Sequence, residues 1–248
     1  MERLTGGRWM VLAVALAAGL GAQRCAHPYH VGPLRPAPDQ AEQMSIADDG
    51  TVTYIRDRLE VSLRPMSDDE LDRQFVGQSQ AGPKSTNPYT FSNTEVADQG
   101  VQQPSRFTVF RLRVKNYAYP KVRIDPVRMV MHTGNGREYW SLSLEQLDAY
   151  FRAYALGYRG NEYGRYKERL DVLARTMYKN EEIFSGQEKA GYVVFPVLHP
   201  DVVSAEVEVL EAMLRFDYRN EPVESARIAY HFVRDVGRLT PAGAVVAR

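Results

Sequence analysis

Cysteine is nearly missing from this sequence of 248 residues, which contains only Cys25. A single cysteine cannot form an intramolecular disulfide, which excludes a small secreted domain held together by disulfides. Net charge is missing as well, because 31 Lys and Arg balance 31 Asp and Glu. Proteins that bind nucleic acid usually carry a basic excess on one face, so this balance argues against a nucleic-acid partner.

The sequence also lacks the motifs of the common enzyme classes. It has no His-Glu-x-x-His zinc helix, no Gly-x-Ser-x-Gly nucleophile elbow, no phosphate-binding loop and no dinucleotide fingerprint. His132, His199 and His231 are scattered near expected strand ends, and we expect them at the surface. No catalytic residue, metal ligand or cofactor is therefore predicted. The alternative is an envelope hydrolase whose active site is assembled from scattered residues, and convergence of these histidines with acids in a cleft would favour it.

The N-terminal apolar run is too short for a membrane-spanning helix, which needs roughly 20 residues. The run extends from Trp9 to Leu20, after the basic residues Arg3 and Arg8, and small residues follow it. A basic start, a short apolar core and a small-residue end are typical of a secretory signal. Residues 1–24 are therefore predicted to be a signal peptide of an exported protein. A buried first helix of a cytoplasmic protein is the alternative.

Cys25 lies where the lipidated cysteine of a bacterial lipoprotein would lie. The residues before it, Ala22, Gln23 and Arg24, depart from the lipoprotein pattern, which has a Leu-like residue and then two small residues. Two endings of the signal stay open: lipidation of Cys25, or ordinary cleavage at Gly21 or Ala22. We expect a periplasmic or outer-membrane-associated protein, and lipidation would add a membrane anchor.

Residues 25–50 are predicted to be a tether, because prolines favour an extended chain that forms neither a helix nor a central strand. The prolines in question are Pro28, Pro33, Pro36 and Pro38. Residues 239–248 are mostly small and aliphatic, and we expect a disordered tail. The folded domain is therefore placed at residues 51–238.

Within the domain, apolar and polar residues alternate in short runs, as they do in half-buried β-strands. The clearest run is 107–116, where Phe110, Leu112 and Val114 should face the core. Two further strands are expected at the continuous apolar run 191–196 and at the alternating residues Ile228, Tyr230 and Phe232. Seven to nine such strands with turns between them predict a mainly β protein, an antiparallel β-sandwich.

Two segments of the domain are not expected to form strands. Ser67 precedes three acidic residues, which predicts a short capped helix through Phe75. Residues 77–88 are rich in Gly, Ser, Pro and Asn, and we expect them to be a mobile excursion.

Residues 143–179 switch from the strand period to the helix period. Ser143 and Gln146 fit a capping box, so a first helix should start there. The segment is predicted to be a helical hairpin inserted between strands. Four of its apolar residues should be buried against the sheet: Leu147, Phe151, Leu170 and Leu173.

Tyrosine is abundant, with 15 residues, and five of them lie in this hairpin: Tyr150, Tyr154, Tyr158, Tyr163 and Tyr166. The first three are spaced by four and would share a helix face. Their rings either pack the hairpin onto the sheet or form a patch for a protein, a glycan or a lipid surface of the cell envelope, since Tyr is enriched in recognition surfaces.

Three stretches resemble exported bacterial domains with a telokin-like immunoglobulin fold. They are residues 110–116, 184–196 and 214–232, and their strand pattern carries the resemblance. The resemblance implies an immunoglobulin-like β-sandwich that serves in binding or assembly without chemistry of its own, and it assigns no functional residue. The predicted function is a non-enzymatic cell-envelope binding or assembly module, with a hydrolase or a glycan-binding domain as the alternatives.

Overall fold

The computed structural model describes residues 29–80, 84–91, 105–157, 162–239 and 245–247. The expected signal peptide, Cys25 and Tyr158 lie outside these ranges, and what the sequence predicts for them stays a prediction. Within the described part of the chain, no helix is both long and apolar enough to cross a membrane.

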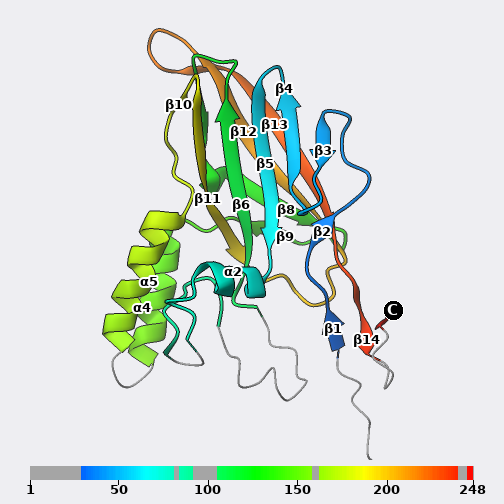
Figure 1. Ribbon diagram of the computed structural model, residues 1–248, viewed down its shortest axis with the longest axis vertical. Helices are drawn as coiled ribbons and strands as arrows, with labels where there is room; N and C mark the ends of the chain where they lie inside the picture. Colours follow the sequence, from blue (N-terminus) through cyan, green and yellow to red (C-terminus); the bar gives the residue numbers. More distant parts are fainter. Residues whose placement is uncertain (1–28, 81–83, 92–104, 158–161, 240–244, 248) are drawn as a thin grey trace, which may run out of the picture.

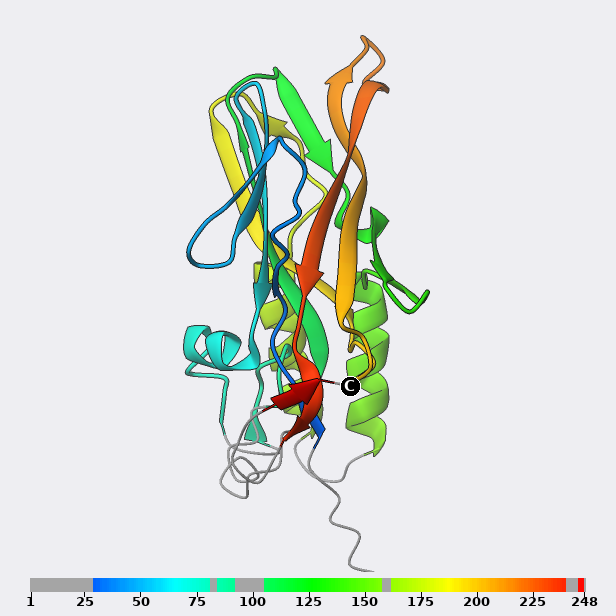
Figure 2. The same cartoon turned by 90° about the vertical axis from the view of Figure 1, so that its right-hand side faces the viewer.

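Two antiparallel sheets are stacked face to face, as the turned view in Figure 2 shows. The smaller sheet contains β3 (Met44–Ile46), β4 (Val52–Arg56), β5 (Leu59–Met66), β6 (Phe107–Asn116) and β11 (Gln187–Pro196). The larger sheet contains β2 (Arg35–Pro36), β7 (Lys121–Ile124), β8 (Met129–Thr133), β9 (Glu138–Trp140), β10 (Ile183–Phe184), β12 (Ser204–Phe216) and β13 (Pro222–Val233). The short 3-10 helix η2 (Pro126–Arg128) leads into β8.

The strand order is β11-β6-β5-β4-β3 in the smaller sheet and β10-β7-β12-β13-β2 in the larger one, where β8 pairs with β12 and β9 pairs with β8. A third, small sheet contains β1 (Tyr29–Val31), β14 (Val236–Leu239) and β15 (Val245–Ala247). The predicted mainly β, antiparallel sandwich is therefore confirmed.

The main hydrophobic core lies between the two large sheets. Phe110, Leu112 and Val114 are fully buried there, while their neighbours Arg111 and Arg113 are exposed. Strand β6 thus has the bounds and the orientation that its alternating sequence predicted. The predictions for Ile228, Tyr230 and Phe232 on β13 and for the run buried on both faces of β11 are confirmed too.

The predicted helical hairpin consists of α4 (Leu144–Gly157) and α5 (Glu162–Thr176). Its capping box is present, because the Ser143 N–H donates to Gln146 Oε1 (2.8 Å) and the Gln146 N–H donates to Ser143 Oγ (3.2 Å). The hairpin lies at the lower end of the molecule in Figure 1 and packs on β6 and β11, where it forms a second hydrophobic core. Leu147, Phe151 and Leu173 are buried in that core as predicted, whereas Leu170 is only partly buried.

This second core gives a direct prediction for stability. Leu147→Ala should lower the free energy of unfolding by about 2–4 kcal/mol, because Leu147 is fully buried and truncation leaves a cavity. Leu156→Ala is the matched control on the same helix, since Leu156 is 84% exposed. Urea denaturation of both variants measures the difference. Equal losses would mean that this face of α4 does not pack on the sheet.

Much of the expected tether belongs to the fold, so that prediction is wrong from residue 29 onward. Strand β2 pairs with β13, and β3 pairs with β4. Pro36 can lie in β2 because β2 is an edge strand, where a residue without an N–H is tolerated. The disordered tail is also wrong for 245–247, which pairs with β14 as β15.

The expected excursion at residues 77–88 is corrected as well, because its second half is buried. Asn87 is fully buried; its Nδ2 donates to Asp72 Oδ1 (3.0 Å), and its Oδ1 accepts the Tyr89 N–H (3.0 Å). The Tyr89 ring is also fully buried, and its hydroxyl lies 2.6 Å from Thr176 Oγ1 on α5. A polar sequence can therefore pack inside when its groups are hydrogen-bonded.

The short helix α2 (Asp68–Gln74), which holds Asp72, begins at the Ser67 cap that the sequence predicted, and the cap is a full capping box. Ser67 Oγ accepts the Glu70 N–H, and the Glu70 carboxylate accepts the Ser67 N–H.

Candidate functional site

Four turns meet at one end of the sandwich, which we call the loop end. They are residues 57–58, 117–120, 185–186 and 217–221. The first two are joined by the Tyr117 N–H, which donates to Arg58 O (3.1 Å). The second and third are joined by the Ser185 N–H, which donates to Pro120 O (3.1 Å). In Figure 1 the loop end is at the top, while α4, α5, β1 and β14 are at the bottom.

Asn116, the last residue of β6, holds the turn 117–120 in place. It is fully buried, and its Nδ2 donates to the carbonyl oxygens of Tyr119 and Ile183, both at 2.9 Å. Its Oδ1 accepts the Tyr119 N–H at 3.0 Å. One side chain therefore fixes residues 117–120 and fastens them to β10.

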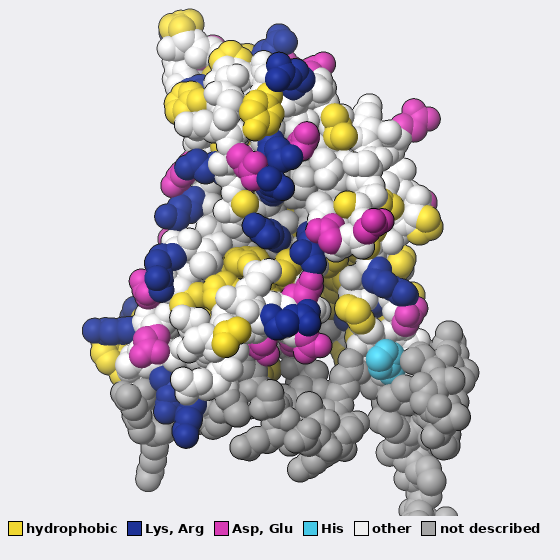
Figure 3. Space-filling view, in the orientation of Figure 1, with side chains coloured by type: hydrophobic (Ala, Val, Ile, Leu, Met, Phe, Trp, Pro, Cys, Tyr) yellow, Lys and Arg dark blue, Asp and Glu magenta, His cyan; other side chains and the backbone are white. Residues whose placement is uncertain are grey.

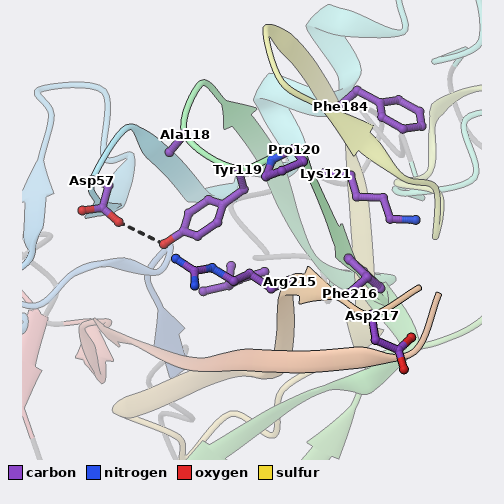
Figure 4. Close-up of a pocket in the computed structure, with 10 residues that line it drawn as sticks. Asp57, Ala118, Tyr119, Pro120, Lys121, Phe184, Arg215, Phe216 and Asp217 are labelled. Carbon is purple, nitrogen blue, oxygen red and sulfur yellow. Dashed lines mark hydrogen bonds between the residues drawn. The ribbon is translucent and has the colours of Figure 1, made fainter. Parts of the chain in front are cut away.

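A pocket of about 660 Å³ opens between the turns (Figure 4). Its lining combines aromatic, apolar and charged residues: Asp57, Ala118, Tyr119, Pro120, Lys121, Phe184, Leu214, Arg215, Phe216 and Asp217. This volume is in the range of pockets that hold a small molecule or a projecting group of a partner, roughly 300–1,000 Å³.

Tyr119 and Asp57 form the polar part of the pocket. The Tyr119 hydroxyl donates to Asp57 Oδ2 at 3.1 Å, the bond drawn in Figure 4. Burial and this hydrogen bond raise the pKa of Tyr119, so its hydroxyl stays protonated at neutral pH. Asp57 has a φ of 54°, and Asn220 in another turn has 66°; no other described non-glycine residue has a positive φ. Such a backbone costs on the order of 1 kcal/mol, and it tends to occur at functional sites.

The two basic residues of the lining are already paired with acids of the protein. Lys121 Nζ lies 2.8 Å from Glu182 Oε1 and 4.7 Å from the centroid of the Phe216 ring. Arg215 Nε lies 3.1 Å from Glu224 Oε2. The hydrogen bond from Lys121 holds the pKa of Glu182 below its usual value. A ligand in the pocket would therefore contact aromatic rings that lie beside these two ion pairs.

Exposed aromatic rings lie on the loop end, and one of them, Phe184, lines the pocket. Tyr117 is 43% exposed, Phe184 50% and Tyr218 89%. Arginines lie over two of them: the Arg58 guanidinium is 6.0 Å from the Tyr117 ring centroid, and that of Arg219 is 5.3 Å from Tyr218. Apolar and basic side chains are close together at the top of the molecule in Figure 3. Aromatic residues and Arg are the types enriched where proteins bind one another.

The tyrosines that the sequence singled out do not form one exposed row. Tyr163 is 65% exposed and Tyr150 is 39% exposed. Tyr166 is buried, and its hydroxyl donates to Asp148. Tyr154 is partly buried between the guanidinium groups of two arginines. These residues belong to the helical hairpin, which lies at the end opposite the loop end (Figure 1).

Two of the three histidines share a row on the outer face of the larger sheet. His231 on β13, Glu206 on β12 and His132 on β8 are cross-strand neighbours, and His231 Nε2 lies 2.9 Å from Glu206 Oε2. His199 instead pairs with Asp201 (Nδ1–Oδ1 2.6 Å). None of the three lines the pocket. Among the described residues, no group of three or more His, Cys, Asp or Glu could hold a metal ion.

The sequence did not predict the pocket residues, because they come from segments far apart in the chain. The local signals that could have pointed to them are Asp57, whose residue type favours tight turns, and the aromatic turn at 117–120. Comparison of the chain with family models, with curated proteins and with solved structures found no significant match.

Proposed function

We propose that the chain is an exported, non-enzymatic binding module that recognises a protein of the cell envelope with its loop end. The observation that carries this proposal is the set of exposed aromatic side chains at the loop end: Phe184, which lines the pocket, and Tyr117 and Tyr218 on neighbouring turns. Exposed aromatic rings beside arginines have the composition of interface hot spots. A surface without a partner would more often carry small polar residues in such turns.

The orientation of the domain fits this proposal. The first described strand, β1, lies at the end of the molecule opposite the loop end (Figures 1 and 2). If the N-terminal segment is anchored to a membrane through Cys25, the loop end faces away from that membrane. An immunoglobulin-like topology, as the telokin-like resemblance implies, would likewise present its turns to a partner.

A protein partner is favoured over a glycan because the aromatic rings extend beyond the pocket onto separate turns. Tyr117 and Tyr218 belong to turns after β6 and β12, and neither lines the pocket. A broad surface of this kind suits an interface of many residues, with the pocket holding one projecting side chain.

Photo-crosslinking in cells tests the proposal. Benzoylphenylalanine in place of Tyr218 should give an adduct with a protein, whereas the same residue in place of Leu156 at the helical end should not. Phe184→Ala should reduce the Tyr218 adduct by about tenfold or more, because a hot-spot ring is removed. Phe184 is half exposed, so its loss should not unfold the domain. An adduct only with glycan, or one that Phe184→Ala leaves unchanged, would contradict the proposal.

A further inference from the structure

Strand β13 has one edge that is paired along its length and another that is largely free. On one side it pairs with β12 from Pro222 to Val233. On the other side it pairs with β2 at Phe232 and Val233 only. Within the described chain, no group outside β12 hydrogen-bonds to the backbone of residues 223–229. These seven residues extend over about 20 Å.

The sequence after β2 explains why pairing stops. The Ala37 N–H donates to His231 O (3.0 Å), but the next residue is Pro38, which has no N–H to donate. The Gln40 side chain then closes the ladder: its Oε1 accepts the His231 N–H (3.1 Å) and its Nε2 donates to His231 O (2.6 Å). The chain leaves the edge at this point.

The free edge presents regularly spaced hydrogen-bonding groups. Because the N–H and C=O of His231 face this edge, strand alternation directs those of Ala229, Arg227 and Ser225 to it as well. The β12–β13 ladder has two irregularities opposite residues 224–228, and their extra residues lie on β12; the third has its extra residue on β13 at Val223, before Ser225, so the alternation from Ser225 to His231 is kept. Ser225 and Arg227 are exposed. Figure 2 shows no strand of the same sheet beside the upper half of β13 on this side.

We propose that this edge binds an extended segment of the partner polypeptide, which adds a strand to the sheet next to β13. The inference rests on the proposed function, because it takes the partner to be a protein. Free edge strands are ready-made templates for pairing, and proteins normally cover or blunt them. Here β2 covers only the lower part, and the free part begins at Pro222, directly after the loop-end turn 217–221. A partner bound at the loop end can therefore extend along β13.

A second copy of this chain fits the edge less well than another polypeptide does. Two-fold antiparallel pairing of β13 with itself would bring the two Arg227 side chains close together at the centre. Like charges across strands destabilise a pair. The occupant is therefore expected to be a different segment, with no positive charge opposite Arg227.

The test selects binders from a random decapeptide library displayed on phage, with the full mature chain as the target. Selected peptides should slow hydrogen exchange of the Ser225, Arg227 and Ala229 amides. Arg227→Pro removes the outward N–H and should weaken their binding by about tenfold, the worth of one or two backbone hydrogen bonds. Arg227→Ala is the matched control, since it removes the same side chain and keeps the N–H; its affinity should be unchanged.

Three results would overturn the edge site: no peptide is selected, the selected peptides leave these amides unprotected, or they bind Arg227→Pro as tightly as Arg227→Ala. Self-association that Arg227→Pro abolishes would replace the partner segment by a second copy. The exchange measurement uses the unaltered chain, so it decides the matter even if the proline variant does not fold. If Phe184→Ala reduces the crosslinked adduct at residue 218 but Arg227→Pro does not, the proposal that a segment binds along β13 is refuted. The proposed function of the loop end is then unaffected.

Discussion

Gly191→Ala should destabilise the protein by about 3 kcal/mol or more, the largest loss expected from a Gly→Ala change among the glycines that the structure describes. A Cβ at residue 191 would lie 2.4 Å from the backbone N of Tyr178 and 2.8 Å from the carbonyl carbon of Met177. Both are backbone atoms, so no side-chain rotation can relieve the clash. The segment after α5 would have to move away from β11.

That movement would break contacts in both cores. The Tyr178 N–H donates to Tyr192 O (2.9 Å), and the Tyr178 ring is buried in the main core. The Met177 side chain packs against the second core, beneath the helical hairpin. Glycine at residue 191 therefore allows the segment after α5 to cross β11 closely, so that its side chains reach both hydrophobic cores.

Urea denaturation measures the effect, with Gly77→Ala as the matched control. A Cβ at residue 77 meets nothing within 4 Å, and the backbone of Gly77 has no positive φ. The control should change the free energy of unfolding by no more than about 0.5 kcal/mol. Similar free energies of unfolding for the two variants would show that residue 191 and the segment Met177–Tyr178 are not in close contact.

The parts of the fold that follow from local sequence were predictable. Strands β6 and β13 alternate apolar residues with charged or polar ones, and this period of two predicts a strand with one buried face. The hairpin was predictable for the same reason, because Leu147, Phe151 and Leu173 recur at the helix period after a capping box.

The errors arise where distant contacts override local composition. The local sequence around Pro36 and Pro38 predicts a tether. Pro36 instead lies in the edge strand β2, where a proline is tolerated. Its partner strand, β13, lies nearly 200 residues further along the chain. Asn87 reads as a loop residue, yet Asp72 satisfies its amide and lets it be buried. The candidate site could not be predicted for the same reason. Four turns meet there, and the sequence of one turn does not indicate which other turns lie beside it.

Asp68 at the start of α2 gives the second large effect, and it depends on pH. Burial raises the pKa of Asp68 to about 6, from an ordinary value of 3.8, and the nearby carboxylates of Asp72 and Asp69 add to the rise. A hydrogen bond with Ser105 and the charge of Arg106 act in the opposite direction. The folded state therefore holds the proton more tightly than the unfolded chain does.

The sign of the pH dependence follows from this difference. Below about pH 3 both states are protonated, and the carboxyl does not affect the free energy of unfolding. Between pH 4 and 6 the folded state binds more protons, so the free energy of unfolding falls as the pH rises. Above pH 6 the full cost is present, at most about 3 kcal/mol for a shift of this size.

Asp68→Asn removes the charge and should therefore stabilise the protein at neutral pH but not in acid. At pH 7.5 the free energy of unfolding should rise by about 1–3 kcal/mol, and at about pH 3 the variant and the parent should agree. Asp69→Asn is the control in the same helical turn, because Asp69 is exposed and its loss removes only a weak interaction with the helix dipole. Urea denaturation at the two pH values decides the outcome. Equal destabilisation of Asp68→Asn at both would mean that the hydrogen bond with Ser105 outweighs burial, and the charged form would then contribute to holding α2 in place.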